Sequence, residues 1–236
     1  MLAKREEGQG CYLSTALGAL VIVALVEWIW PDVIPFTIFQ FWRFDGTIEE
    51  VLKVSWPAFV WGSGVTTVFA IRKWNDPFAG WEEALDLKLG LLSSTFAGVM
   101  EEISFRWLIF YNEIIGYKLI NWLIFGWAGF GVAEWWQLHV SAPVANFFTL
   151  GALQAILFGS LGWAVGAAML TSNGKFRDGH VYQGALGWIN SWFMGMFLFY
   201  LMFQYGLIAA IIVHFLYDAF IHVAIYILAV IRLRTL

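Results

Sequence analysis

The sequence predicts an all-α protein, specifically a polytopic transmembrane helical bundle with about seven spans. Two observations lead to this prediction. The residues are 61% hydrophobic and only 13% charged, whereas a water-soluble domain has about 25% charged residues because its surface faces water. Apolar stretches of about 20 residues, the length that crosses a bilayer as a helix, also recur along the chain. We therefore expect an integral, multi-pass protein surrounded by membrane lipid, in a prokaryotic cell membrane.

The predicted spans are apolar stretches separated by short polar segments. The first follows Lys4 and Arg5 and has no small-residue cleavage site, so we expect an uncleaved anchor rather than a signal peptide. Residues 35–42 are too short to cross and are expected to lie in the membrane interface. In chain order, the predicted spans are residues 12–30, 52–71, 87–112, 119–138, 146–171, 182–204 and 207–231.

Two polar segments are predicted to be loops. Residues 72–88 mix charges with aromatic side chains, which is typical of an interfacial loop, and residues 171–181 are the most polar break in the second half. Lys and Arg fall on both sides of the predicted spans, so their distribution does not fix the orientation. We divide the chain into residues 1–86, with two spans and interfacial loops, and residues 87–236, which hold the candidate site.

Composition also narrows the function. The net charge is −4 and no basic block is present, so we expect no nucleic acid partner. The single cysteine, Cys11, excludes an intrachain disulfide and a multi-cysteine metal site. The sequence has no glycine-rich phosphate loop, nucleophile elbow or HExxH motif. Acyl-enzyme chemistry therefore has no obvious nucleophile.

The third predicted span carries three charged residues, and each costs at least ~2.5 kcal/mol at membrane depth. Glu102 and Arg106 are four residues apart on a helix and can pair. Glu101 is rotated by about 100° from Glu102 and has no such local partner. A carboxylate in these surroundings is a candidate general base. The alternative is that the charges are structural and only hold helices together.

The last predicted span carries His214, Asp218 and His222, each four residues apart, which form one polar stripe on an apolar helix. Such a stripe is expected to face the interior of the bundle. One intramembrane histidine could simply hydrogen-bond across helices, but three titratable groups on one face favour a function. His139 and His180, near the ends of predicted spans, could be solvated loop residues or join the site. Buried carboxylates with histidines suit the activation of water.

These residues resemble a known family. Residues 101–106 (EEISFR) are similar to the EExxxR motif of the CAAX prenyl endopeptidase and bacteriocin-processing (CPBP) intramembrane proteases. Residues 214–218 (HFLYD) are similar to that family's Hxxx(N/D) motif, and residues 193–210 resemble its glycine-containing penultimate helix and turn. The resemblance covers residues 87–225, which we interpret as a CPBP-like protease core.

The resemblance implies hydrolysis of a peptide bond in a membrane-associated protein or peptide, which could be lipidated. It implies that Glu101 activates water, that Glu102 and Arg106 support it, and that His214 and Asp218 lie at the oxyanion, with a further histidine assisting. The family's members are described both as metalloproteases and as metal-free enzymes. A divalent metal such as zinc therefore stays open, since histidines and carboxylates would serve as its ligands. No other cofactor is indicated.

The sequence departs from the family at its last motif. Asp218 stands where the family often has Asn, and an ionised carboxylate would repel an oxyanion. Asp218 would have to be protonated, be paired, for instance with His222, or act on a metal.

The family's middle motif, FxxxH, has two candidate positions. Phe176 and His180 match it literally, whereas spacing from the glutamates favours His139, with Trp135 in the phenylalanine position. If all spans cross the membrane, His180 and His214 would be ~25 Å apart, at a rise of ~1.5 Å per residue. This distance favours His139. If residues 146–171 do not cross the membrane fully, this distance argument fails and His180 can be the middle-motif histidine. Both stay candidates.

Two other classes of function remain open. The chain could be a non-catalytic membrane scaffold or chaperone that reuses the protease fold, as Asp218 and the ambiguous middle motif allow. It could instead be a proton-coupled transporter, because buried Glu, His and Asp chains also form proton relays. Transporters usually show repeats or paired broken helices, and the sequence shows none. A protease needs Glu101, a middle histidine and His214 around one cavity, whereas a relay needs groups that reach both faces.

Overall fold

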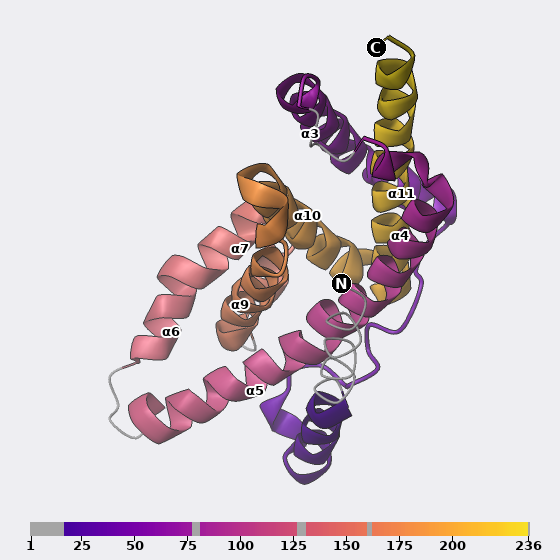
Figure 1. The fold of residues 1–236 in the computed structure, drawn as a ribbon. Coiled ribbons are helices and arrows are strands. Elements are labelled where there is room, and N and C mark those ends of the chain that lie inside the picture. Colours follow the sequence, from indigo (N-terminus) through magenta and orange to yellow (C-terminus); the bar gives the residue numbers. More distant parts are fainter. Residues whose placement is uncertain (1–16, 77–80, 127–130, 160–161, 236) are drawn as a thin grey trace. The chain divides into compact units, whose positions relative to one another are not determined.

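The computed structural model describes residues 17–76, 81–126, 131–159 and 162–235. Every regular element in this part of the chain is a helix, so the all-α prediction is confirmed. The chain forms two compact units, each built from two separate stretches (Figure 1). The division predicted at residue 86 stays a prediction. The first unit comprises Met1–Trp42 and Ile103–Phe176, and the second comprises Arg43–Glu102 and Arg177–Leu236.

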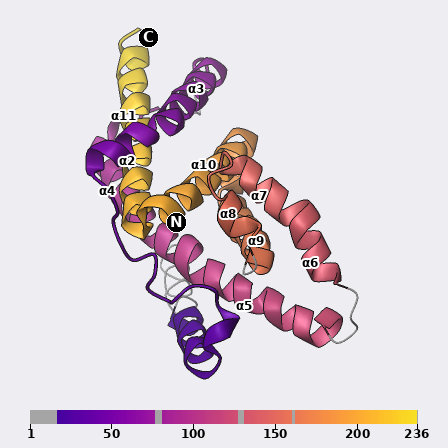
Figure 2. The same cartoon turned by 180° about the vertical axis from the view of Figure 1, so that it is seen from behind.

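In the second unit, α11 (Leu207–Thr235) is the helix that the others contact. It packs against α4 (Leu87–Glu101), α10 (Gly184–Tyr205) and α3 (Trp56–Lys73), and both views show α4 running beside it (Figures 1 and 2). The unit also contains α2 (Ile48–Val54) and the short 3-10 helices η2 (Glu83–Leu85) and η7 (Val181–Gln183).

Small residues bring α4 close to α11. Gly90, Ser94 and Gly98 repeat every four residues on α4 and are buried. A Cβ on Gly98 would lie 3.0 Å from the Phe215 backbone nitrogen, and one on Gly90 would lie 2.8 Å from the His222 ring. Small residues at this spacing let helix backbones approach closely. The approach places the end of α4, with its two glutamates, beside α11.

Within the described part of the chain, two helices are long and apolar enough to cross a membrane, Val181–Tyr205 and Leu207–Thr235. They confirm the last two predicted spans as continuous apolar helices. The pair α2 and α3 would add a third span if it is counted as one, with a bend of 50°. The bend lies at Ser55, next to Pro57, which has no backbone N–H to continue the helix. The total of about seven spans stays a prediction.

A single residue, Gly206, joins α10 to α11. Its φ of +94° is in the left-handed region that favours glycine. A Cβ at this position would lie only 2.0 Å from the Arg43 carbonyl oxygen. The turn therefore requires glycine, and the two apolar helices follow one another without a loop.

The first unit is assembled from shorter helices, and π-helical stretches connect several of them (Figure 2). The first residue of η3 and the last two of α9 belong to the second unit. In chain order, its elements are the helix Leu17–Ile29, η1 (Pro31–Val33), the π-helical η3 (Glu102–Ile109), α5 (Phe110–Ile120), the π-helical η4 (Asn121–Gly126), α6 (Val132–Trp136), the π-helical η5 (Gln137–Ser141), α7 (Ala142–Phe148), α8 (Gln154–Leu157), η6 (Gly162–Ala164) and α9 (Val165–Asp178).

The segment 35–42, predicted to lie in the interface, packs against α5 and η3. The Thr37 and Ile38 carbonyl oxygens accept hydrogen bonds from the Tyr111 hydroxyl and the Trp107 Nε1. Its location in a membrane interface stays a prediction. Residues 12–16 of the predicted anchor and residues 77–80 of the predicted loop lie outside the described residues, as do Lys4, Arg5 and Cys11.

Two predicted spans are not continuous helices. The span predicted at 119–138 is interrupted at Gly131, with φ +57°. The span predicted at 146–171 is interrupted at Leu150 and Gly151, with φ +56° and +75°. A right-handed helix does not pass through left-handed residues. The prediction failed because hydropathy records composition and not backbone conformation.

The loop predicted at 171–181 is wrong for residues 171–178, which belong to α9. Ser172 and Asn173 are fully buried there, and the Ser172 hydroxyl donates to the Phe105 carbonyl oxygen. The polar residues of this segment make hydrogen bonds inside the first unit, and they do not mark a loop.

Candidate functional site

The two glutamates stand where α4 ends. The helix begins at Asp86, whose side chain accepts a hydrogen bond from the Leu89 backbone N–H at 2.9 Å. It ends at Glu101, and Glu102 follows directly. Glu102 is fully buried, whereas the Glu101 side chain is 29% exposed. Of the two side chains, Glu101 is the more exposed, although its Oε2 atom is buried.

His214 of α11 holds Glu102. Its Nδ1 lies 2.7 Å from the Glu102 Oε1, and both side chains are buried. An ionised carboxylate only accepts hydrogen bonds, so Nδ1 donates in this contact and the ring orientation is fixed. The other ring nitrogen, Nε2, is thereby directed toward Glu101.

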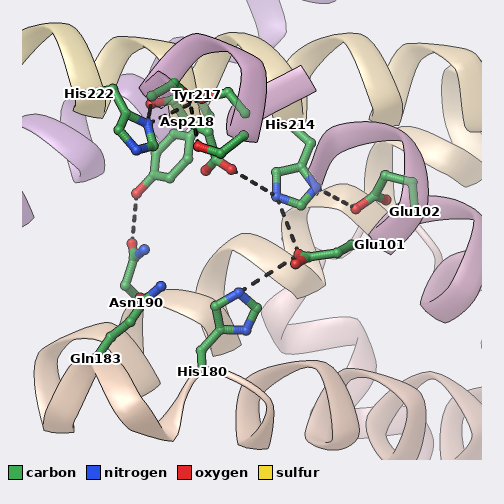
Figure 3. A network of polar contacts seen from close by, with 12 residues as sticks. Glu101, Glu102, His180, Gln183, Asn190, His214, Tyr217, Asp218 and His222 are labelled. Carbon is green, nitrogen blue, oxygen red and sulfur yellow. Dashed lines mark hydrogen bonds and ion pairs between the residues drawn. The ribbon is translucent and has the colours of Figure 1, made fainter. Parts of the chain in front are cut away.

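The Glu101 carboxylate lies between two histidine rings (Figure 3). Its Oε2 is 3.7 Å from the His180 Nε2 and 3.9 Å from the His214 Nε2. These separations are longer than direct hydrogen bonds and are within the range of ion pairs. The structure therefore brings the first glutamate, the His180 alternative and the last-motif histidine to one place within the second unit.

Asp218 faces the same ring nitrogen from one turn further along α11. Its Oδ2 is 3.6 Å from the His214 Nε2, and its side chain is partly exposed. Figure 3 shows its carboxylate turned toward His214. The partner of the Asp218 carboxylate is thus His214, whereas the sequence suggested His222.

His222 completes the predicted stripe but has a different partner. Its Nδ1 lies 2.9 Å from the Asp218 backbone carbonyl oxygen and 3.1 Å from the Ser94 hydroxyl. The Ser94 hydroxyl also bonds the Gly90 carbonyl oxygen at 2.9 Å. His222 therefore links α11 to α4, which leaves His214 and Asp218 as the stripe's contribution to the site.

The turn after α9 delivers His180. The His180 backbone N–H donates to the Arg177 carbonyl oxygen at 2.9 Å, and the Arg177 guanidinium stacks on the Trp188 ring at 4.1 Å. Asp178 accepts hydrogen bonds from Arg177 at 2.8 Å and from Trp188 at 3.0 Å. The Arg177 bond, and then the Trp188 bond, hold the pKa of Asp178 below its usual range. These contacts anchor the turn to α10.

Arg106 lies in the first unit. It is fully buried, and its guanidinium sits over the Phe176 ring at 3.9 Å from the centroid, a cation–π contact. Phe176 is the phenylalanine of the literal FxxxH match. The predicted pairing of Arg106 with Glu102 stays a prediction.

His139, the other middle-motif candidate, also belongs to the first unit. It is exposed on η5, its Nδ1 contacts the Trp135 carbonyl oxygen at 2.8 Å, and its ring stacks on the Trp135 ring. The distance estimate that favoured His139 assumed that residues 146–171 form one continuous span. The structure interrupts this segment, so the distance argument against His180 no longer applies.

Sequence reasoning missed a polar clamp behind the site. The Asn190 Oδ1 of α10 accepts hydrogen bonds from the Tyr217 hydroxyl at 2.6 Å and from the Trp61 Nε1 at 2.9 Å. Figure 3 shows the bond between Tyr217 and Asn190. Together, the two bonds join α3, α10 and α11. The signal was present, because an amide inside an apolar predicted span needs partners.

Comparisons with protein-family models, with curated proteins and with solved structures found no match to this chain. The chemistry must therefore be argued from geometry. Among the described residues, no three side chains of His, Cys, Asp or Glu are grouped so that they could hold a metal ion.

Proposed function

We propose that this chain is an intramembrane endopeptidase of the CPBP type, which hydrolyses a peptide bond in a membrane-associated or lipidated protein. The observation that supports this most is the Glu101 carboxylate between the Nε2 atoms of His180 and His214. All three residues belong to the second unit. A partly exposed carboxylate flanked by two histidines suits the activation of a single water.

In the proposed reaction, Glu101 takes a proton from a water molecule and the resulting hydroxide attacks the peptide carbonyl carbon. The Nε2–H groups of His180 and His214 donate to the oxyanion that forms. Glu101 then gives its proton to the leaving nitrogen, the C–N bond breaks, and a carboxylic acid and an amine are released. Glu102 acts as a positioning residue, because it holds the Nδ1 side of His214.

Asp218 has a place in this scheme that follows from its contact with His214. While the carboxylate faces the His214 Nε2, at 3.6 Å, it balances the charge of a protonated ring. It would oppose an oxyanion bound at the same nitrogen unless its carboxyl is neutral at that moment. An Asn at this position would not carry the charge that opposes the oxyanion.

The substitution Glu101→Gln tests the proposal. We expect cleavage to fall by about 10²–10⁴-fold, because the amide cannot accept the proton, while the fold is kept. Native membranes with the full chain would be incubated in heavy-oxygen water, and mass spectrometry would count new carboxyl ends that carry the label.

Glu83→Gln is the matched control, since Glu83 is an exposed carboxylate of the same unit. Unchanged labelling in Glu101→Gln would overturn the hydrolytic role and favour the scaffold. If Glu101→Gln instead abolishes a proton flux across vesicles that shows no labelled ends, the transporter is favoured.

We also infer that the chain is an integral, multi-pass membrane protein. Support comes from two helices with the length and composition of spans, and from exposed apolar side chains along α11 such as Val223, Ile227 and Ile231. Alkaline carbonate washing of membranes is the check. Integral protein stays in the pellet, and release into the supernatant would contradict the inference.

A further inference from the structure

The C-terminal ends of two helices meet within the second unit. Arg232, in the last turn of α11, donates from its Nε to the carbonyl oxygen of Trp74, which directly follows α3, at 2.6 Å. Both views show α3 beside this end of α11 (Figures 1 and 2). The last carbonyl oxygens of a helix have no partner within the helix, and this bond satisfies one of them. It also fixes the position of the Arg232 guanidinium.

Trp81 packs against this guanidinium. Its ring centroid lies 5.5 Å from the Arg232 Cζ, a cation–π contact, and the residue is only 3% exposed. The Trp81 Nε1 donates to the Lys73 carbonyl oxygen at 3.1 Å, and its ring meets the Trp74 ring edge to face at 6.0 Å. The surroundings of Arg232 are therefore built from α3, α11 and the segment before η2.

Arg232 carries a buried charge that lacks a counter-ion among the described residues. Its exposed fraction is only 8%. The carboxylates of the described residues form their ion pairs with other cations, as Asp76 does with Lys73 at 2.7 Å. Glu82 and Glu83, in the neighbouring segment, are exposed. Buried charges in proteins are paired, so the position of Arg232 calls for an anion.

The two Nη groups of Arg232 are the donors left for that anion. Neither donates to a described residue, because the hydrogen bond of this side chain is the one from Nε. Neither is among the fully buried side-chain nitrogens that lack a partner, so both lie at accessible surface. The N–H groups of an arginine form a planar fork that matches two oxygens of a phosphate.

The place of Arg232 in the chain selects a lipid as the source of the phosphate. It is the first Lys or Arg after Arg177, and it stands at the end of a helix with the length and composition of a membrane span. When that helix crosses, its last turn lies at the level of the headgroups, where tryptophans are enriched. Three apolar side chains near the site are exposed, Ile71 at 74%, Ile231 at 48% and Leu233 at 37%.

We propose that Arg232 binds the phosphate of a phospholipid, with its two Nη groups donating to two phosphate oxygens. Trp81 supports the guanidinium, and the acyl chains lie against the exposed apolar side chains of α3 and α11. The inference rests on the membrane location of the chain and not on the proposed hydrolysis, because none of the candidate-site residues takes part.

The test uses the full chain in detergent micelles, with native mass spectrometry to measure bound lipid. The probes are dioctanoyl phosphatidylglycerol, dioctanoylglycerol, which has the same acyl chains and no phosphate, and inorganic phosphate. We expect the phospholipid to bind on the order of tenfold more tightly than dioctanoylglycerol, because only the phosphate pairs with the fork. Equal binding of the two lipids would overturn the proposal. Inorganic phosphate that binds as tightly as the phospholipid would assign the site to a free anion and overturn the lipid source.

Two substitutions locate the binding. Arg232→Gln removes the fork and should bring the two lipids to about equal binding. Arg43→Gln is the matched control, since Arg43 is an exposed arginine of the same unit that already pairs with Asp45 at 3.0 Å, and it should keep the preference for phospholipid.

Arg232→Lys covers the case in which Arg232→Gln does not fold. Its ammonium keeps the charge and a donor for the Trp74 carbonyl oxygen but has no fork, so we expect a several-fold loss of the preference. An unchanged preference in either folded variant would contradict the assignment to Arg232.

Discussion

The two units bury their polar groups in different ways. In the second unit, charged side chains face one another, as in the pair Glu102 and His214 and the contacts of Glu101 with two histidines. In the first unit, Gln137 donates to the Gly162 carbonyl oxygen, Arg106 lies over the Phe176 ring, and Lys175 pairs with Glu113. Among the described residues, the contacts between histidines and carboxylates lie in the second unit. We infer that chemistry belongs to the second unit and that the first unit's polar groups stabilise interrupted helices.

The helices of the two units also differ in how continuous they are. The glycine and serine positions of α4 allow long, uninterrupted packing on α11. The first unit instead contains π-helical stretches and left-handed residues between short helices. Stretches of this kind are frequent at functional sites because they displace side chains from regular helical positions. In the first unit, the π-helical η5 carries Gln137.

The largest expected effect is that of His214→Ala. The buried Glu102 carboxylate loses its Nδ1 donor, and we expect the free energy of unfolding to fall by about 3–5 kcal/mol. His139→Ala is the matched change in the first unit, where the ring is exposed and contacts only its own helix, and it should cost no more than about 0.5 kcal/mol. Denaturant titration in detergent measures both. Equal losses would contradict the contrast between the units.

A smaller effect is expected from Gly98→Ala. The added Cβ would lie 3.0 Å from the Phe215 backbone nitrogen, so α4 must move away from α11 at a cost of about 1–3 kcal/mol. Gly64→Ala in α3 meets no atom within 4 Å, and removing a mid-helix glycine there should stabilise by about 0.5–1 kcal/mol. The same denaturant titration shows whether each substitution lowers or raises the free energy of unfolding. A stabilising Gly98→Ala would show that the close approach is not required.

The smallest effects test the interruption of the first unit after α7. Leu150 has φ +56°, a conformation that costs a non-glycine residue roughly 1–2 kcal/mol, so Leu150→Gly should be neutral or slightly stabilising. Gly151→Ala, at φ +75°, should instead destabilise by about 1–2 kcal/mol. Thermal unfolding of the two variants compares them. A continuous helix through this point would reverse both results, because alanine would then be the favoured residue.

Much of the fold is visible in the sequence, and the rest is hidden for definite reasons. The last two spans were predictable because hydrophobicity and helix length agree there. The interruptions at Leu150 and Gly151 were not, because no polar residue marks them and a hydropathy window averages over them. Ser172 and Asn173 misled the prediction in the other direction, since buried polar residues look like a loop until their partners are known.

For the candidate site, residue spacing was the informative signal. Positions 214 and 218 share a helical face, and the structure places His214 beside both glutamates and Asp218 beside His214. The choice between His139 and His180 depended on a span count that composition could not supply. The Asn190 clamp went unnoticed because its two donors, Tyr217 and Trp61, are ordinary aromatic residues of predicted spans.

The tight turn at Gly206 also bears on how the chain enters its membrane. Between Asp178 and Asp218 the sequence has no Asp, Glu, Lys or Arg, and no loop separates the two apolar helices. Insertion machinery that sorts spans by the charge of the connecting loops has nothing to act on between them. If both helices cross, they are inserted together as one hairpin, and Arg177 before it and Arg232 and Arg234 after it emerge on the same side.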